Sequence, residues 1–174
     1  PSNITIKRFE TPLQVGFARK IESILASRFS KVIFMDADVW FVLNPQELIS
    51  SPLLEKQGYL LWPDLPGDNC RGWQATDSGV MLWDKSRHLE LLRKALSVTL
   101  DRYSAEAEGD KESYALAHGS ALTHVSDYPA FTGFVETEGE SKWVRGCAML
   151  QFYQNKMAFC HSTLFKYGLH AKLH

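Results

Sequence analysis

The residues of this chain best suited to chemistry are two aspartates, Asp36 and Asp38, which follow Lys31 and the apolar run Val32–Met35. Strand side chains alternate in direction, so both carboxylates are expected to project from one side of the backbone where the strand leaves the core. Two like charges this close favour a cation, and carboxylates, waters and substrate phosphates together fill the oxygen shell of Mn²⁺ or Mg²⁺. The spacing therefore predicts a metal site for a phosphate-bearing substrate; a strand end in a solvated turn is the simpler alternative.

The composition is that of one folded domain. The 174 residues are 45% hydrophobic and 22% charged, enough for one sizeable core, and we predict a single domain over residues 1–174. The formal net charge of −1, with both signs mixed along the chain, gives no electrostatic footprint for nucleic acid or an anionic membrane. Cys70, Cys147 and Cys160 lack the C-x-x-C spacing of structural zinc sites.

The elements around the two aspartates follow from caps and periodicity. Thr11 and Pro12 predict a helix start, and apolar residues at helical spacing carry this helix to about Ser30, with Lys20 on its outward face. The strand predicted at 32–36 is an unbroken apolar run up to Asp36, which is typical of a central strand buried on both faces of a parallel sheet. The order helix then buried strand suggests a doubly wound sheet.

Caps and apolar runs also predict the elements of the rest of the chain. Asn44 is expected to cap a short helix through Leu48, Asp84 another helix, and a third helix is expected from 109 to about 117, ended by Gly119. Strands are predicted at 59–62, 79–83, 147–153 and 157–160, with a loop at 63–72. The repeated order of strand and helix favours an α/β fold.

Other polar residues fall near predicted strand ends, where ligands of open α/β sheets bind. Asp77-Ser78-Gly79 precedes a strand; the small Ser-Gly pair allows close approach to a sugar or diphosphate, or simply forms a tight turn. Asp110 is interpreted as a helix N-cap, which does not exclude a hydroxyl contact. His161 is expected to be either an exposed histidine or a further metal ligand, and Lys166 either a surface lysine or a cation that neutralises a leaving diphosphate.

Six blocks of sequence, in order, resemble the fungal MNN1-type α-mannosyltransferases, which have the glycosyltransferase A fold. The blocks are VIFMDAD at 32–38, NPQEL at 44–48, LLWPD at 60–64, DSG at 77–79, DKSRH at 84–88 and GDKES at 109–113. The likeness is weaker at 146–153 and 159–162. The resemblance implies an α/β, Rossmann-like nucleotide-diphospho-sugar transferase sheet flanked by helices. Because few residues precede Asp36, it also implies an N-terminally truncated domain whose nucleotide-binding half lies upstream.

The resemblance implies an enzyme that transfers mannose from GDP-mannose to a mannose-bearing glycan with retention, in protein glycosylation or mannan synthesis. The implied roles are: Mn²⁺ (or Mg²⁺) held by Asp36, Asp38 and His161; catalytic residues Asp77, Asp110 and Glu112; and substrate contacts from Asp36, Asp38, Trp62, Ser78, Gly79 and Lys166. Family members are type II membrane proteins of the Golgi lumen. Membrane attachment is therefore expected only through an anchor outside this chain, and no nucleic-acid partner is expected.

Two other functions stay open from the sequence. The first is a non-catalytic remnant of a glycosyltransferase domain that binds glycan or a partner protein. The second is a phosphatase of the haloacid dehalogenase type, which also carries D-x-D after an apolar strand and uses the first aspartate as nucleophile. That chemistry needs a later lysine and a further acidic pair, and no D-D or G-D-x-x-x-D pattern follows Asp38.

Overall fold

Helices and short strands are mixed along the chain. The computed structural model describes residues 16–64, 76–103, 110–120, 122–126, 129–138 and 141–162. The elements are α1 (Ala18–Ala26), β1 (Lys31–Met35), β2 (Val39–Phe41), α2 (Pro45–Ile49), α3 (Pro52–Gln57), β3 (Tyr59–Pro63), β4 (Thr76–Asp84), α4 (Lys85–Tyr103), α5 (Ser113–His118), β5 (Ala130–Glu138), β6 (Ser141–Tyr153) and β7 (Lys156–His161). Within these ranges, no helix combines the length and hydropathy needed to cross a membrane.

The strands form two antiparallel sheets, ordered β1-β4-β3 and β2-β7-β6-β5. The predicted doubly wound parallel sheet is therefore wrong for the described residues, and β1 lies at the edge of its sheet rather than in the centre. The physical reason is that a short apolar run indicates coverage on both faces but not the direction of the neighbouring strand. The fold is a mixed α/β arrangement with small antiparallel sheets.

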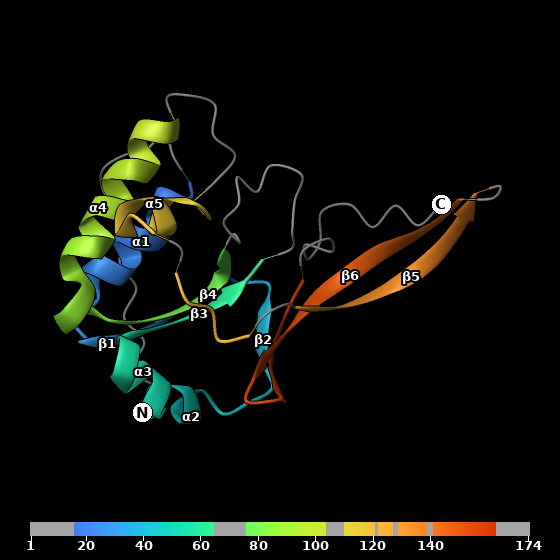
Figure 1. Cartoon of the computed structure of the whole chain (residues 1–174), viewed down its shortest axis with the longest axis horizontal. Coiled ribbons are helices and arrows are strands. Elements are labelled where there is room, and N and C mark those ends of the chain that lie inside the picture. The colour runs from blue at the N-terminus through green and yellow to red at the C-terminus, as the bar shows by residue number, and fades with distance from the viewer. Residues whose placement is uncertain are drawn as a thin grey trace.

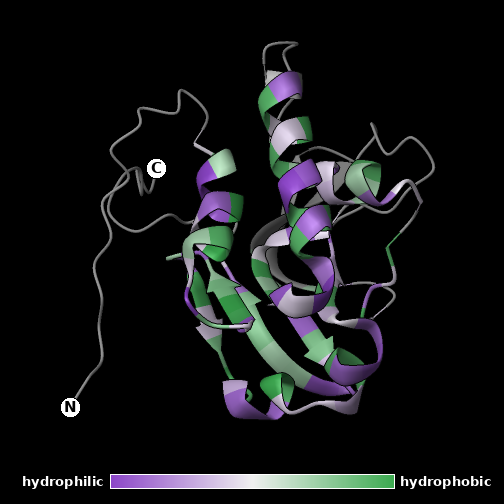
Figure 2. Cartoon of the chain, turned by 90° about the vertical axis from the view of Figure 1, so that its left-hand side faces the viewer, coloured by the Kyte–Doolittle hydropathy of each residue, from purple (hydrophilic) through white to green (hydrophobic). Residues whose placement is uncertain are grey.

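Both faces of the three-stranded sheet are covered, because β4 is apolar on each side. Met81 and Trp83 join a core cluster with residues of α1, α4 and α5, whereas Val80 and Leu82 join a second cluster with residues of α2, α3, β2 and β7. Figure 1 shows the first group of helices above the sheet and α2 and α3 below it. Figure 2 shows strands coloured mostly as hydrophobic beneath helices of mixed polarity. Val80 and Met81, which belong to opposite clusters, immediately follow Gly79, so this packing fixes the strand beside the D-x-D segment.

Three of the predicted helix boundaries are confirmed by local hydrogen bonds and backbone geometry. The Asn44 side chain accepts from Gln46 N at 3.0 Å and starts α2, and Asp84 Oδ1 accepts from Ser86 N at 3.0 Å where α4 begins. Gly119 ends α5 with φ +82°, a conformation that glycine adopts without steric cost. These features depend only on sequence neighbours, which is why the sequence predicts them.

Other boundaries differ from the prediction. The helix start at Thr11 lies outside the described residues, and α1 ends at Ala26 rather than near Ser30. The strand expected at 79–83 begins three residues earlier, so the Asp77-Ser78 pair is part of β4 instead of a turn before it. The last predicted helix begins at Ser113, not at 109. Among the described residues, three elements were not predicted, β2, α3 and β5, and β6 is longer than expected.

Candidate functional site

The D-x-D segment is a tight turn that connects the two sheets. β1 ends at Met35 and β2 begins at Val39, so the turn, rather than strand alternation, sets the direction of the two carboxylates. Asp36 N donates to Gly79 O of β4 at 2.8 Å, and Ser162 N donates to Asp38 O at 2.9 Å. One aspartate is thereby fixed to the first sheet and the other to the end of the second.

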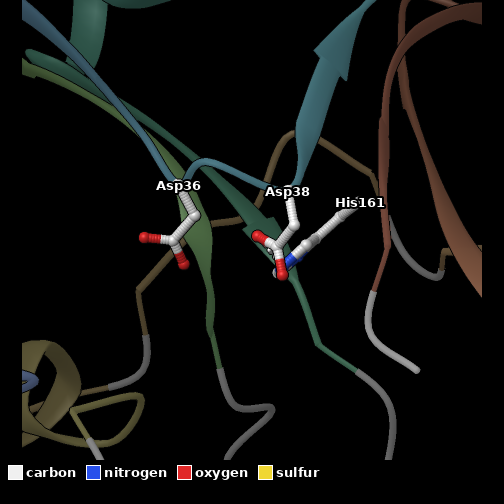
Figure 3. Close-up of side chains that lie close together, drawn as sticks. All are labelled: Asp36, Asp38 and His161. Atoms are coloured by element: carbon white, nitrogen blue, oxygen red, sulfur yellow. Dashed lines mark ion pairs between the residues drawn. The ribbon is translucent and has the colours of Figure 1, made fainter. Parts of the chain in front are cut away.

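His161 completes a three-residue cluster with these aspartates. It is the last residue of β7 and pairs with Val39 of β2, which brings its ring beside Asp38, with Nε2 3.5 Å from Asp38 Oδ1. One potential ligand atom from each of Asp36, Asp38 and His161 lies within 4.8 Å of the others. Figure 3 shows the Asp38 carboxylate beside the His161 ring and the Asp36 carboxylate to one side of them. Carboxylate oxygens and an imidazole nitrogen are a donor set that divalent cations accept.

A bulge in β4 decides which face of the sheet each of two adjacent side chains takes. The register with β3 steps from Leu61 opposite Met81 to Trp62 opposite Asp77. Asp77 consequently points to the side of the second sheet, while Ser78 points to the side of the helices, as their hydrogen-bond partners show. Between these two pairs β4 advances by four residues and β3 by one, so the register shifts by an odd number of residues, which exchanges the two faces. Bulges commonly re-aim side chains next to functional sites in this way.

The Asp77 carboxylate is buried and is fully engaged by donors. Its Oδ1 accepts from His161 Nδ1 at 2.9 Å and from Gly79 N at 3.0 Å, and its Oδ2 accepts from Gln151 Nε2 at 3.1 Å. The same Gln151 nitrogen donates to Pro63 O at 2.7 Å. Asp77 is 1% exposed, so its contacts are with the protein.

Ser78 belongs to a second network on the helix side of the sheet. Lys20 Nζ of α1 donates to Asp36 Oδ2 at 2.6 Å and to Ser78 Oγ at 3.2 Å. Ser78 Oγ donates to Asp110 Oδ1 at 2.9 Å, and Tyr114 OH donates to Asp110 Oδ2 at 3.0 Å. The Asp110 side chain therefore does not act as the predicted N-cap of α5, because both of its oxygens accept from side chains.

Burial and charge shift several pKa values in this cluster. Burial alone lowers the pKa of His161, but the hydrogen bond to Asp77 and the charges of Asp77, Asp38 and Asp36 outweigh it and raise that pKa above 6.5. Burial raises the pKa of Asp110, with partial compensation from Lys20 and from its hydrogen bonds. Four aspartates thus share the site with one lysine and one histidine, an excess of negative charge that favours a bound cation.

The other predicted site residues differ in where the structure places them. Trp62 is fully buried, its indole Nε1–H donates to Phe152 O at 2.8 Å, and its ring packs on Phe159. In this structure no face of that ring is open to a substrate. Glu112 lies at the N-terminal end of α5 and is partly exposed, and Lys166 lies outside the described residues. Gly79 contacts the cluster through its backbone, against the His161 ring.

The sequence prediction missed Lys20 and Gln151, which hold Asp36 and Asp77 by hydrogen bonds. Helical periodicity put Lys20 on the outward face of its helix, but that side chain is only 16% exposed and points to Asp36. Gln151 lies in a strand where the apolar pattern drew attention to its neighbours. In each case the signal is a polar residue at a buried position, which becomes visible only when the packing partner is known.

Comparison with known proteins gives one family. Residues 2–73 match a family model whose description is "Mannosyltransferase putative". The matched segment covers less than half of the chain; it includes Asp36 and Asp38 but ends before β4 and β7, which contribute Asp77 and His161. A comparison with curated proteins finds no match. The family match supports a mannosyltransferase family, and in general a glycosyltransferase role.

Proposed function

We propose that this chain is part of a metal-dependent glycosyltransferase that moves mannose from GDP-mannose to a mannose-bearing glycan with retention. The observation that carries the proposal is the convergence of His161 with Asp36 and Asp38, because one ligand atom from each lies within 4.8 Å of the others. The match to a mannosyltransferase model over residues 2–73 supports the reaction class. In cells, we place the protein in the Golgi lumen as part of a type II membrane protein.

The residues present fit a divalent cation. The side chains of Asp36 and Asp38 are 25% and 17% exposed, so a cation and a substrate phosphate can reach them from solvent. Two carboxylates and one imidazole would leave further coordination positions for waters and phosphate oxygens, as Mn²⁺ and Mg²⁺ require. Bound there, the cation would act as a Lewis acid that stabilises the leaving diphosphate.

The other polar residues of the cluster have distinct roles in this proposal. Lys20 places a second positive charge beside Asp36, where it favours the negative charge that develops on a leaving diphosphate. Ser78 holds the Lys20 ammonium and is itself held by Asp110. Because Asp110 is 1% exposed, its effect on a substrate acts through Ser78 and Lys20. Glu112 is exposed enough to orient a hydroxyl of the donor or acceptor.

One observation favours the second candidate, a glycan-binding remnant without turnover. Lys20 Nζ lies 2.6 Å from Asp36 Oδ2, so one of the two D-x-D carboxylates already has a cationic partner within the chain. An ion-pair network of this kind is complete without a metal and stabilises the fold on its own. The remnant hypothesis therefore predicts a folded chain that binds neither Mn²⁺ nor a sugar nucleotide.

Calorimetric titration with GDP-mannose, with and without Mn²⁺, separates the two candidates. The transferase proposal predicts metal-dependent binding that is lost in Asp36→Ala and in Asp38→Ala. Asp84→Asn is the matched control, because it removes an aspartate charge from the far end of β4 while asparagine caps a helix as well as aspartate does. No binding by the folded chain under any condition would refute the transferase proposal and favour the remnant.

A further inference from the structure

We infer that Asp77 is a positioning residue that holds the His161 ring in the orientation and tautomer that present Nε2 to the cation site. This inference rests on the proposed function, since it requires a cation between Asp36, Asp38 and His161. It replaces a direct catalytic role for Asp77, because a carboxylate that is 1% exposed and contacted by three donors does not reach a substrate.

The first step of the argument is that the two ring nitrogens of His161 face different groups. Nδ1 lies 2.9 Å from Asp77 Oδ1, and Nε2 lies 3.5 Å from Asp38 Oδ1. A neutral imidazole carries one N–H, and a carboxylate at hydrogen-bond distance from Nδ1 retains the proton there. The lone pair of Nε2 is then directed to the side of the ring where Asp38 lies. Metal-binding histidines generally donate their second nitrogen to a carboxylate or carbonyl in this way.

The second step is that Asp77 is itself immobilised from both sides. Gly79 N fixes Oδ1 at 3.0 Å, and Gln151 Nε2 fixes Oδ2 at 3.1 Å while it also donates to Pro63 O at 2.7 Å. The β4 bulge supplies the direction of the side chain, and a fully buried glutamine from β6 supplies the second anchor. A buried carboxylate is tolerated only where donors compensate its lost hydration, and here each donor also fixes its position.

A purely structural role is the alternative, in which Asp77 and His161 form an ion pair that stabilises the fold and nothing more. The two roles differ in what a substitution changes. Loss of a structural pair lowers the free energy of unfolding and leaves the affinity of the folded protein for Mn²⁺ unchanged. Loss of a positioning residue lowers that affinity, and it does so only when His161 is present.

The test is Mn²⁺ binding to the donor-free chain, measured by calorimetry and by the EPR signal of free Mn²⁺. In Asp77→Asn, one amide oxygen replaces two carboxylate oxygens. The new NH₂ group then faces either Gln151 Nε2 or the pair Gly79 N and His161 Nδ1, so at least one of these donors loses its acceptor. We expect binding weaker by about ten- to a hundred-fold, the usual effect of losing such an outer partner. Asp77→Ala, which leaves room for water, serves as the second variant, and circular dichroism verifies folding of each.

A double-mutant cycle with His161→Ala isolates the positioning effect. We expect Asp77→Asn to cost nothing further once His161 is alanine, because the two residues act as a unit. Asp84→Asn, on the same strand, should bind Mn²⁺ like the unmodified chain. In the metal-free chain, ¹⁵N chemical shifts of the imidazole are expected to report Nδ1–H, and this preference should be lost in Asp77→Ala.

The outcomes separate this inference from the proposed function. If the unmodified chain binds Mn²⁺ and the Asp77 variants bind it within about twofold of the same affinity, the inference is overturned and the metal site stands. An additive loss in the Asp77→Asn/His161→Ala double variant overturns it as well. If the folded, unmodified chain binds no Mn²⁺, the proposed metal function fails, and the positioning role fails with it.

Discussion

Replacing Gly79 by alanine should displace the His161 ring and weaken the proposed metal site. A Cβ at residue 79 would lie 2.4 Å from His161 Cε1, 2.5 Å from Nδ1 and 3.0 Å from Nε2. Gly79 does not have a positive φ, so the effect would come from this contact and not from backbone strain. Movement of the backbone is opposed by the hydrogen bond from Asp36 N to Gly79 O, at 2.8 Å.

The size of the effect follows from these distances. Ordinary van der Waals contact begins near 3.4 Å, so the ring must retreat by about 1 Å, enough to lengthen the Nδ1 to Asp77 bond beyond hydrogen-bond range. The loss of one charged hydrogen bond lowers the free energy of unfolding by about 1.5–3 kcal/mol. Without its orienting partner, His161 should contribute less to the site, and we expect Mn²⁺ to bind about ten- to a hundred-fold more weakly.

Mn²⁺ calorimetry and urea unfolding of Gly79→Ala give the two measurements. Gly16→Ala is the matched control, because a Cβ there would have no neighbour within 4 Å. The control should keep the Mn²⁺ affinity of the unmodified chain. If Gly79→Ala binds Mn²⁺ with unchanged affinity while His161→Ala loses it, the ring tolerates the displacement, and the reasoning from ring position to metal affinity is refuted.

Four further predictions concern charge. Lys20→Met removes the cation beside Asp36. A unit positive charge about 4 Å from a divalent cation costs about 2 kcal/mol of repulsion in water, so Mn²⁺ should bind the variant about 5–30-fold more tightly. Calorimetry that shows no gain in affinity would contradict this. Mn²⁺ binding should weaken as pH falls through the raised pKa of His161, because protons compete for Nε2. In the metal-free chain, protonated His161 should contribute to the free energy of unfolding. This contribution is fully present below pH 6.5 and is lost as pH rises through the raised pKa of His161, which urea unfolding across this range measures. Burial raises the pKa of Asp110, so the unmodified chain should lose stability as pH rises from 3.8 through that pKa, and Asp110→Asn should lack this loss; parallel curves for the two proteins would show that Asp110 is not the cause.

Local features of the fold were predictable because their causes lie within a few residues. Asn44 and Asp84 supply the acceptors that helix starts require, and Gly119 supplies the positive φ that ends α5. The spacing of Asp36 and Asp38 likewise predicts repulsion between two nearby carboxylates, which a cation would relieve, without any knowledge of the fold. His161 has no such local signal: the sequence around it left it as an exposed histidine or a ligand, and only the resemblance implied it as their partner; the structure places it beside Asp38.

The sheet topology and the contacts across the site depend on which strands pair. Strand pairing cannot be read from the pattern of a single sequence. β1 is apolar from Val32 to Met35, as a central parallel strand would be, but among the described residues it is an antiparallel edge strand covered on both faces by other layers. The bulge that puts Asp77 on the side of the second sheet and Ser78 on the side of the helices lies in the pairing of β4 with β3, a non-local register. Lys20 appears outward by periodicity, and only the position of β1 shows that it points to Asp36.

The arrangement explains why the D-x-D motif by itself is a weak signal and the assembled cluster a stronger one. Asp36 is fixed to the first sheet, Asp38 and His161 to the second, and Asp77 joins the two by contacting His161 from β4. The family match covers the D-x-D turn but not His161 or Asp77, so those two residues are an independent observation. A solvated turn does not require a histidine held by a buried carboxylate at its side. The carboxylate and its glutamine anchor are buried at a cost in hydration, and the positioning role that we propose for Asp77 gives a physical reason for their place beside the turn.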